Sequence, residues 1–103
     1  MHIYLPQPLQ AREVTMVVLS ENQIQLCYKL WRRCCFGNGH MLIDNLINGF
    51  PTNLQSIARE SLNDLIRKNI VRRKPTRHGY AVYLNLDHRN DIEKVLRKKY
   101  GFI

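Results

Sequence analysis

The tripeptide Gly49-Phe50-Pro51 restricts the fold of this chain more than any other feature, because it divides a helical pattern into two parts. Proline lacks the N–H that a helix interior needs, and glycine suits the left-handed conformation that often ends a helix. The apolar spacing predicts a short helix over 41–48 before the break and a longer helix over about 53–68 after it. The sequence therefore predicts a helix, a tight turn and a second helix in close succession.

Two capping boxes predict where helices begin. In Ser20-Glu21-Asn22-Gln23 and in Thr52-Asn53-Leu54-Gln55, the first hydroxyl can accept from a backbone N–H while the fourth side chain reaches back. A first helix is expected from residue 20 to the turn residues Phe36-Gly37-Asn38-Gly39. Its predicted apolar stripe consists of Ile24, Cys27, Tyr28, Trp31 and Cys34 or Cys35. The stripe predicted for the helix over 53–68 consists of Leu54, Ile57, Ala58, Leu62, Leu65 and Ile66.

A β-hairpin is predicted to follow the longer helix. Asn69 can cap that helix, residues 70–74 begin apolar and finish cationic, and residues 75–79 have turn composition. Residues 80–86 alternate in polarity, which is typical of a half-buried strand. Its expected buried side consists of Tyr80, Val82, Leu84 and Leu86. A last helix is expected over 87–100, with its apolar face formed by Ile92, Val95, Leu96 and Tyr100.

The excess positive charge of the chain lies in its last third. The sequence has 16 Lys and Arg against 8 Asp and Glu, for a formal net charge of +8. Basic and acidic residues balance up to residue 66, so the last 37 residues carry the whole excess. A one-sided basic surface suits a polyanion such as nucleic acid. The alternative is a charged face that only keeps the protein in solution.

The run SLNDLIRKNIVRRKPTRHGYAVYLN, residues 61–85, resembles the winged helix-turn-helix family of DNA-binding domains. It combines an apolar helix end, a short aliphatic strand start, a basic turn with glycine and an aromatic return strand. One departure is the segment 35–40, where the family often has a short first strand. The resemblance implies an α+β fold over 20–103: a three-helix core, a β-hairpin wing and an additional C-terminal helix. Residues 1–19 are expected to form an arm or a short strand.

The resemblance also implies a function, namely binding of double-stranded DNA by a small transcription regulator that is not an enzyme. The helix over 53–68 would read base edges in the major groove, and the basic wing over 72–79 would hold the backbone. The expected DNA-binding residues are Asn53, Gln55, Ser56, Arg59, Asn63 and Arg67 on the helix, and Arg72, Arg73, Lys74, Arg77 and His78 on the wing. Two alternatives stay open: a winged helix that binds a protein partner, and an RNA-binding domain.

A homodimer is a further hypothesis, because the arm and the last helix exceed a minimal winged helix. The residues that motivate it are Val14, Val17, Val18, Leu19, Ile92, Val95 and Leu96. The N-terminus lacks the pattern of a secretory signal, and no apolar run is long enough to span a membrane. We therefore expect a cytoplasmic protein with reduced thiols.

The cysteines do not predict a metal or catalytic site. Cys27, Cys34, Cys35 and His40 lack the Cys-x-x-Cys spacing of zinc sites, and nothing near them resembles an oxyanion or substrate site. The Gly37-Asn38-Gly39 fragment follows a predicted helix rather than a strand, unlike a phosphate-binding loop. The expectation is no metal, no cofactor and no catalytic residue.

Overall fold

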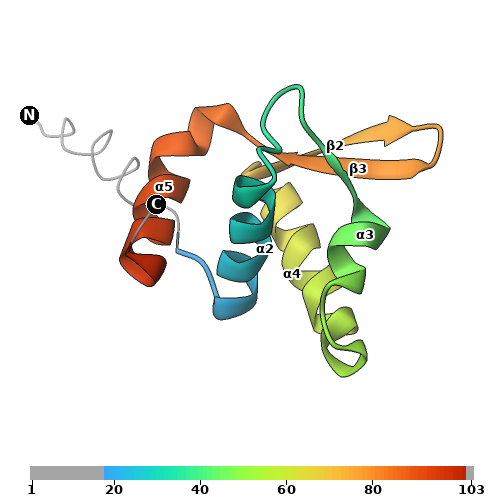
Figure 1. Ribbon diagram of the computed structural model, residues 1–103, viewed down its shortest axis with the longest axis horizontal. Helices are drawn as coiled ribbons and strands as arrows, with labels where there is room; N and C mark the ends of the chain where they lie inside the picture. The colour runs from blue at the N-terminus through green and yellow to red at the C-terminus, as the bar shows by residue number, and fades with distance from the viewer. Residues whose placement is uncertain (1–17, 102–103) are drawn as a thin grey trace, which may run out of the picture.

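The structure, a computed structural model, describes residues 18–101 and has the predicted α+β class (Figure 1). The described chain contains four α-helices and one three-stranded antiparallel sheet. In chain order the elements are α2 (Glu21–Arg32), β1 (Met41–Leu42), α3 (Ile43–Asn48), α4 (Gln55–Arg67), β2 (Val71–Thr76), β3 (Gly79–Leu84) and α5 (Arg89–Tyr100). Short 3-10 turns, Thr52–Leu54 and Leu86–His88, precede α4 and α5.

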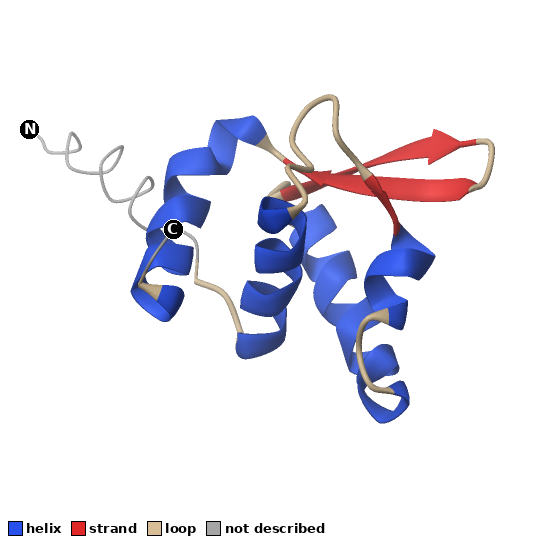
Figure 2. Ribbon diagram, in the orientation of Figure 1, coloured by secondary structure: helices blue, strands red, loops and turns tan. Residues whose placement is uncertain are grey.

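Helix α4 occupies the middle of the fold, where it packs against α2, α3 and β2, while α5 packs on the other side of α2. The helices gather on one side of the sheet, and the tip of the β2–β3 hairpin extends beyond them (Figure 2). The largest fully buried side chains come from every helix and from both long strands: Leu26, Leu30, Leu46, Ile47, Leu62, Leu65, Val71, Val82, Leu84, Ile92 and Leu96.

The sheet has the order β1-β3-β2, so β3 lies between the other two strands. The hairpin register pairs Val71 with Leu84 at its base and Thr76 with Gly79 at its tip. Only residues 77 and 78 lie outside the strands, which makes the turn shorter than the predicted 75–79. Gly79 has a φ of 122°, which favours glycine, and the Thr76 hydroxyl closes the turn by donating to the Gly79 carbonyl.

The predicted capping box at the start of α2 is confirmed. The Ser20 hydroxyl accepts from the Gln23 N–H at 3.2 Å, and the Gln23 side chain accepts from the Ser20 N–H at 3.1 Å. The predicted stripe is only partly correct, because α2 buries Gln23, Leu26, Cys27 and Leu30 and ends at Arg32. Cys34 lies beyond the helix with a φ of 55° and is exposed, whereas Cys35 is buried.

Residues 41–48 are not a continuous helix. Met41 and Leu42 form β1, paired with Val82 and Ala81, and the helix begins only at Ile43. The same edge of β3 also donates a hydrogen bond to the loop that precedes β1, from the Leu84 N–H to the Cys35 carbonyl at 2.8 Å. A strand of two residues is therefore present before α3, where the sequence pattern predicted only a helix. Met41 and Leu42 are extended because their backbones pair with β3, although the spacing of apolar residues over 41–48 fits a helix.

The turn between α3 and α4 differs from its prediction at both ends. Gly49 caps α3 with a φ of −72°, so it is not left-handed. No side chain caps α4, because Pro51 already precedes a 3-10 turn and Thr52 lies inside that turn rather than before it. The Gln55 side chain instead donates to the Phe50 carbonyl at 3.1 Å.

Three residues predicted for the core are exposed. Helix α4 buries Ala58, Leu62 and Leu65, and this spacing rotates Ile57 toward solvent, where it is 46% exposed. Tyr80 and Leu86 are each 51% exposed. Tyr80 lies near the hairpin tip, beyond the helices, and Leu86 has left the strand for a 3-10 turn.

Two of the seven residues proposed for a dimer are unavailable for it. Ile92 and Leu96 are fully buried in the core, so they cannot also form a dimer interface. Val18 is 82% exposed, and Leu19 packs partly against the core. Val14 and Val17, with the rest of the predicted arm up to residue 17, lie outside the described residues.

Candidate nucleic-acid interface

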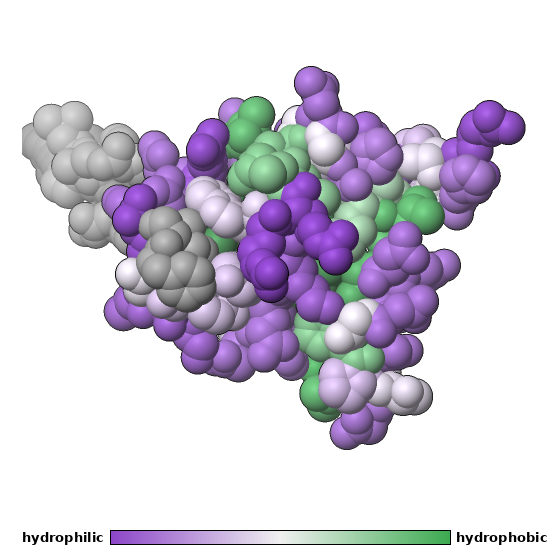
Figure 3. Space-filling view, viewed as in Figure 1, coloured by the Kyte–Doolittle hydropathy of each residue, from purple (hydrophilic) through white to green (hydrophobic). Residues whose placement is uncertain are grey.

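The β2–β3 hairpin carries the most concentrated positive charge of the described chain. Alternation along β2 and the short turn leave Arg72, Arg73, Arg77 and His78 exposed, and Lys74 half-buried. The sequence from 65 to 86 contains no Asp or Glu, and no carboxylate of the described residues forms an ion pair with these cations. The hairpin tip forms a hydrophilic projection at the right of the molecule (Figure 3). The hairpin is therefore a positively charged surface without carboxylate partners among the described residues.

Two of these cations lie over tyrosine rings of the neighbouring strand. The Arg73 guanidinium carbon is 4.5 Å from the centre of the Tyr80 ring, and the Lys74 ammonium is 5.7 Å from that of Tyr83. Contacts of this kind contribute about 0.5–1 kcal/mol at exposed sites. They restrict the side chains while leaving N–H donors available, so less entropy is lost when a phosphate binds.

The predicted face of α4 is open at three of its six positions. The side chains of Asn53, in the preceding 3-10 turn, and of Ser56 and Asn63, in α4, are exposed and make no hydrogen bond within the described residues. Arg59 is held by the Asp44 carboxylate of α3 at 3.2 Å, and Arg67 by Asp64 at 3.0 Å. Gln55 is half-buried and bonded to the turn. Free positive charge on this face is therefore much lower than on the hairpin.

Asp64 connects α4 to α2 rather than facing solvent as a free charge. Its carboxylate accepts from the Gln23 amide at 2.8 Å and pairs with Lys68 and Arg67, each at 3.0 Å. These hydrogen bonds hold the pKa of Asp64 well below its usual range. Because Lys68 and Arg67 neutralise it, Asp64 is a weak source of repulsion toward a bound phosphate.

The depressed pKa gives a testable dependence of stability on pH. Compared with Asp64→Asn, the wild type should be more stable at pH 6, because only a carboxylate makes these ion pairs. An unfolded aspartate titrates near about pH 3.9, so the advantage should be complete above that value and should disappear as the pH falls toward the lower folded-state pKa. Thermal unfolding of both proteins between pH 2 and 6 measures this. A stability difference that does not change with pH would contradict it.

Asn85 fixes the hairpin to the end of α4, and sequence reasoning missed it. This side chain is only 6% exposed; its amide donates to the Asn69 carbonyl at 2.7 Å, and its oxygen accepts from the Asp87 N–H at 3.0 Å. Asn69 has the left-handed φ of 67° that ends α4, as its sequence position predicts. In the sequence, the only indication of this role was that Asn85 carries an amide directly after an apolar strand.

Two of the cysteines, Cys27 and Cys35, are buried in the hydrophobic core. Burial raises the pKa of the Cys27 thiol to about 12, and it also raises the pKa of Cys35. No cluster of three potential metal ligands occurs among residues 18–101, and no helix in that range has the length and apolar character to cross a membrane.

Comparison of the chain with protein-family models, curated proteins and solved structures gives no match.

Proposed function

We propose that residues 20–103 form a winged helix-turn-helix domain that binds double-stranded DNA and serves as a small transcription regulator without enzymatic activity. The observation that carries the proposal is the β2–β3 hairpin, whose four Arg and Lys side chains have no carboxylate partner in the described chain and whose tip extends beyond the helices. The succession α2, β1, α3, α4 and hairpin agrees with this family's order of elements. In the proposed complex, the hairpin is the wing and α4 is the recognition helix.

The wing would bind phosphates. Arg72, Arg73 and Arg77 present guanidinium groups, which can make two parallel hydrogen bonds to one phosphate. Lys74 and His78 would add contacts at the same end of the strand pair. Because phosphate contacts carry no sequence information, this part of the interface would supply affinity and orientation.

Helix α4 would supply sequence discrimination. Asn53, Ser56 and Asn63 are free to contact base edges, and asparagine can make two hydrogen bonds to adenine. Ile57 lies on the same exposed face and offers an apolar contact for a thymine methyl group. Arg59 would contact DNA only by leaving Asp44, an exchange that costs little because exposed ion pairs contribute about 0–1 kcal/mol. Glu60 would select a cytosine amino group.

Fluorescence anisotropy with a labelled random duplex tests the proposal. If about five phosphates are neutralised, the logarithm of the association constant should fall with the logarithm of salt concentration with a slope of about −4 to −5. The measurement covers about 50–300 mM salt, where such a slope changes affinity by several orders of magnitude. An absence of binding at the lowest salt would contradict the proposal and favour a protein partner. An RNA competitor that displaces the protein better than DNA would favour RNA binding.

A further inference from the structure

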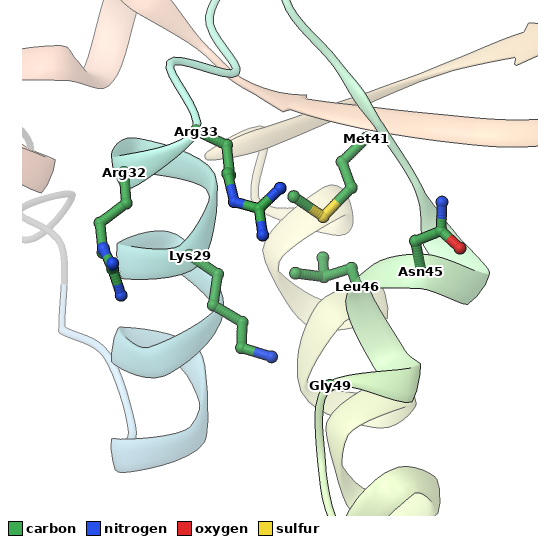
Figure 4. Close-up of a pocket in the computed structure, with 7 residues that line it drawn as sticks. All are labelled: Lys29, Arg32, Arg33, Met41, Asn45, Leu46 and Gly49. Atoms are coloured by element: carbon green, nitrogen blue, oxygen red, sulfur yellow. The ribbon is translucent and has the colours of Figure 1, made fainter.

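A pocket of about 400 Å³ lies between α2 and α3, on the opposite side of α2 from α5 (Figure 4). Helices α2 and α3 both pack on α4, which is seen behind the pocket. The lining contains three cationic side chains, one amide and no carboxylate: Lys29, Arg32, Arg33, Met41, Asn45, Leu46 and Gly49. Its size lies within the range of about 300–1,000 Å³ that small-molecule sites occupy.

Two cations from the end of α2 converge on this pocket. Lys29 and Arg33 extend from α2 toward α3, whereas Arg32 points away from them (Figure 4). Arg32 instead lies 5.6 Å from the centre of the Tyr28 ring. The charge of the pocket interior therefore comes from Lys29 and Arg33, with the Asn45 side chain on the facing helix.

The Lys29 ammonium is seated by the turn that follows α3. It lies 4.8 Å from the centre of the Phe50 ring, and a Cβ added at Gly49 would collide with it. The backbone of Gly49 has ordinary helical angles, so any residue could adopt them. Gly49 matters to the site because it has no side chain, which leaves space for the Lys29 ammonium.

The convergence of Lys29 and Arg33 is unfavourable without an anion. Lys29 lies in the last turn of α2 and Arg33 is its C-cap residue, so two like charges four residues apart repel one another at this end of the helix. The negative end of the helix dipole favours cations in this turn, but it does not require both heads to lie in one pocket. No carboxylate among residues 18–101 pairs with either of them. An anion in the pocket would supply the negative partner that the described chain does not provide.

We propose that this pocket binds a phosphate group. Arg33 offers a planar guanidinium that matches two phosphate oxygens, and Lys29 offers a compact charge. Asn45 also lines the pocket, with its amide turned away from the two cations (Figure 4), and Met41 and Leu46 provide an apolar wall for the part of the ligand that carries the phosphate. The phosphate belongs either to a small molecule or to the DNA backbone. Binding of the group itself does not depend on the DNA-binding proposal.

Thermal unfolding with inorganic pyrophosphate tests the site, with sodium chloride at equal ionic strength as reference. At about ten times its Kd, pyrophosphate should raise the Tm by roughly 5–10 °C. Lys29→Gln/Arg33→Gln should abolish the increase. The matched control, Arg72→Gln/Arg73→Gln, removes the same amount of charge from the hairpin. This variant should still show the increase in Tm with pyrophosphate. The proposal is overturned if pyrophosphate raises the Tm no more than chloride does, or if the hairpin variant loses as much as the pocket variant.

A second variant removes no charge and does not threaten the fold. Gly49→Ala fits the backbone conformation and only forces the Lys29 ammonium to move. Titration calorimetry should show pyrophosphate binding about tenfold weaker in this variant, the loss expected for one charged hydrogen bond of about 1.5 kcal/mol. Unchanged binding in Gly49→Ala would show that the anion does not need the Lys29 ammonium in its observed position and would overturn the arrangement proposed here.

Duplex DNA distinguishes the two sources of the phosphate. If the DNA backbone supplies it, Lys29→Gln/Arg33→Gln should make the salt slope of DNA binding shallower by about 2, and pyrophosphate should compete with DNA. If a small molecule supplies it, the slope should not change and pyrophosphate should bind the DNA complex as well. Because the pyrophosphate titration needs no DNA, a failure of DNA binding and a failure of this site give different results.

Discussion

Replacing Arg72, Arg73 and Arg77 together by glutamine should lower the affinity for duplex DNA by about 10²–10³-fold near 0.1 M salt. Each lost phosphate contact makes the slope of log affinity against log salt shallower by about 0.9, so three contacts change it by about 2.7. The loss is large because these guanidinium groups have no carboxylate partner in the described chain and are free to bind phosphate. Anisotropy titrations at four or five salt concentrations measure both the loss and the slope.

The control for this variant removes the same charge at the other end of the molecule. Lys94, Arg97 and Lys98 lie on α5, far from the hairpin tip (Figure 1). Their replacement by glutamine should change affinity only a few-fold, because distant charges are screened beyond about 10 Å at 0.1 M salt. Equal losses in both variants would mean that total charge, rather than the hairpin, determines binding.

Leu62→Ala should lower the free energy of unfolding by about 3 kcal/mol, within the 2–5 kcal/mol range for such core truncations. Leu62 is 1% exposed in the middle of α4, and a cavity there cannot fill with solvent. Ile57→Ala on the same helix should cost less than about 1 kcal/mol, because this side chain is 46% exposed. Urea denaturation monitored by circular dichroism compares the two.

The contrast between these two variants also tests the proposed function. If Ile57→Ala were the more destabilising change, α4 would be rotated relative to its observed packing. Asn53, Ser56 and Asn63 would then no longer share an exposed face with Ile57, and α4 could not present them to a groove. A stability measurement thus bears on which residues read DNA.

The elements that local residues determine could be predicted from the sequence. The Ser20 capping box, the left-handed Asn69 and the basic hairpin each depend on neighbours within a few positions, and each agrees with the structure. The second capping box failed because a proline one residue earlier already began a turn. Spacing alone could not assign Ile57, since a stripe of period 3.6 indicates a buried face but not its edges.

Features that join distant parts of the chain were beyond sequence reasoning. The Gln23 amide reaches Asp64 across 41 positions, and Arg59 is paired with Asp44 across 15. Both contacts change the charge available on α4. The pocket that we propose for a phosphate group could not be predicted for the same reason, because it forms only when the end of α2 is placed opposite α3 and the turn at Gly49.

The strand order β1-β3-β2 leaves one side of β2 without a neighbour among the described strands. A bare strand edge can pair with the same edge of another copy, and such association leads to aggregation. Pro75 withdraws one donor from that strand, and its cations repel a second copy of themselves. The charge that we propose for DNA binding would thus also oppose association of two copies along this sheet edge. The variant in which Arg72, Arg73 and Arg77 are replaced by glutamine lacks the charges that oppose this association. Its oligomeric state should therefore be checked by light scattering before the DNA titrations.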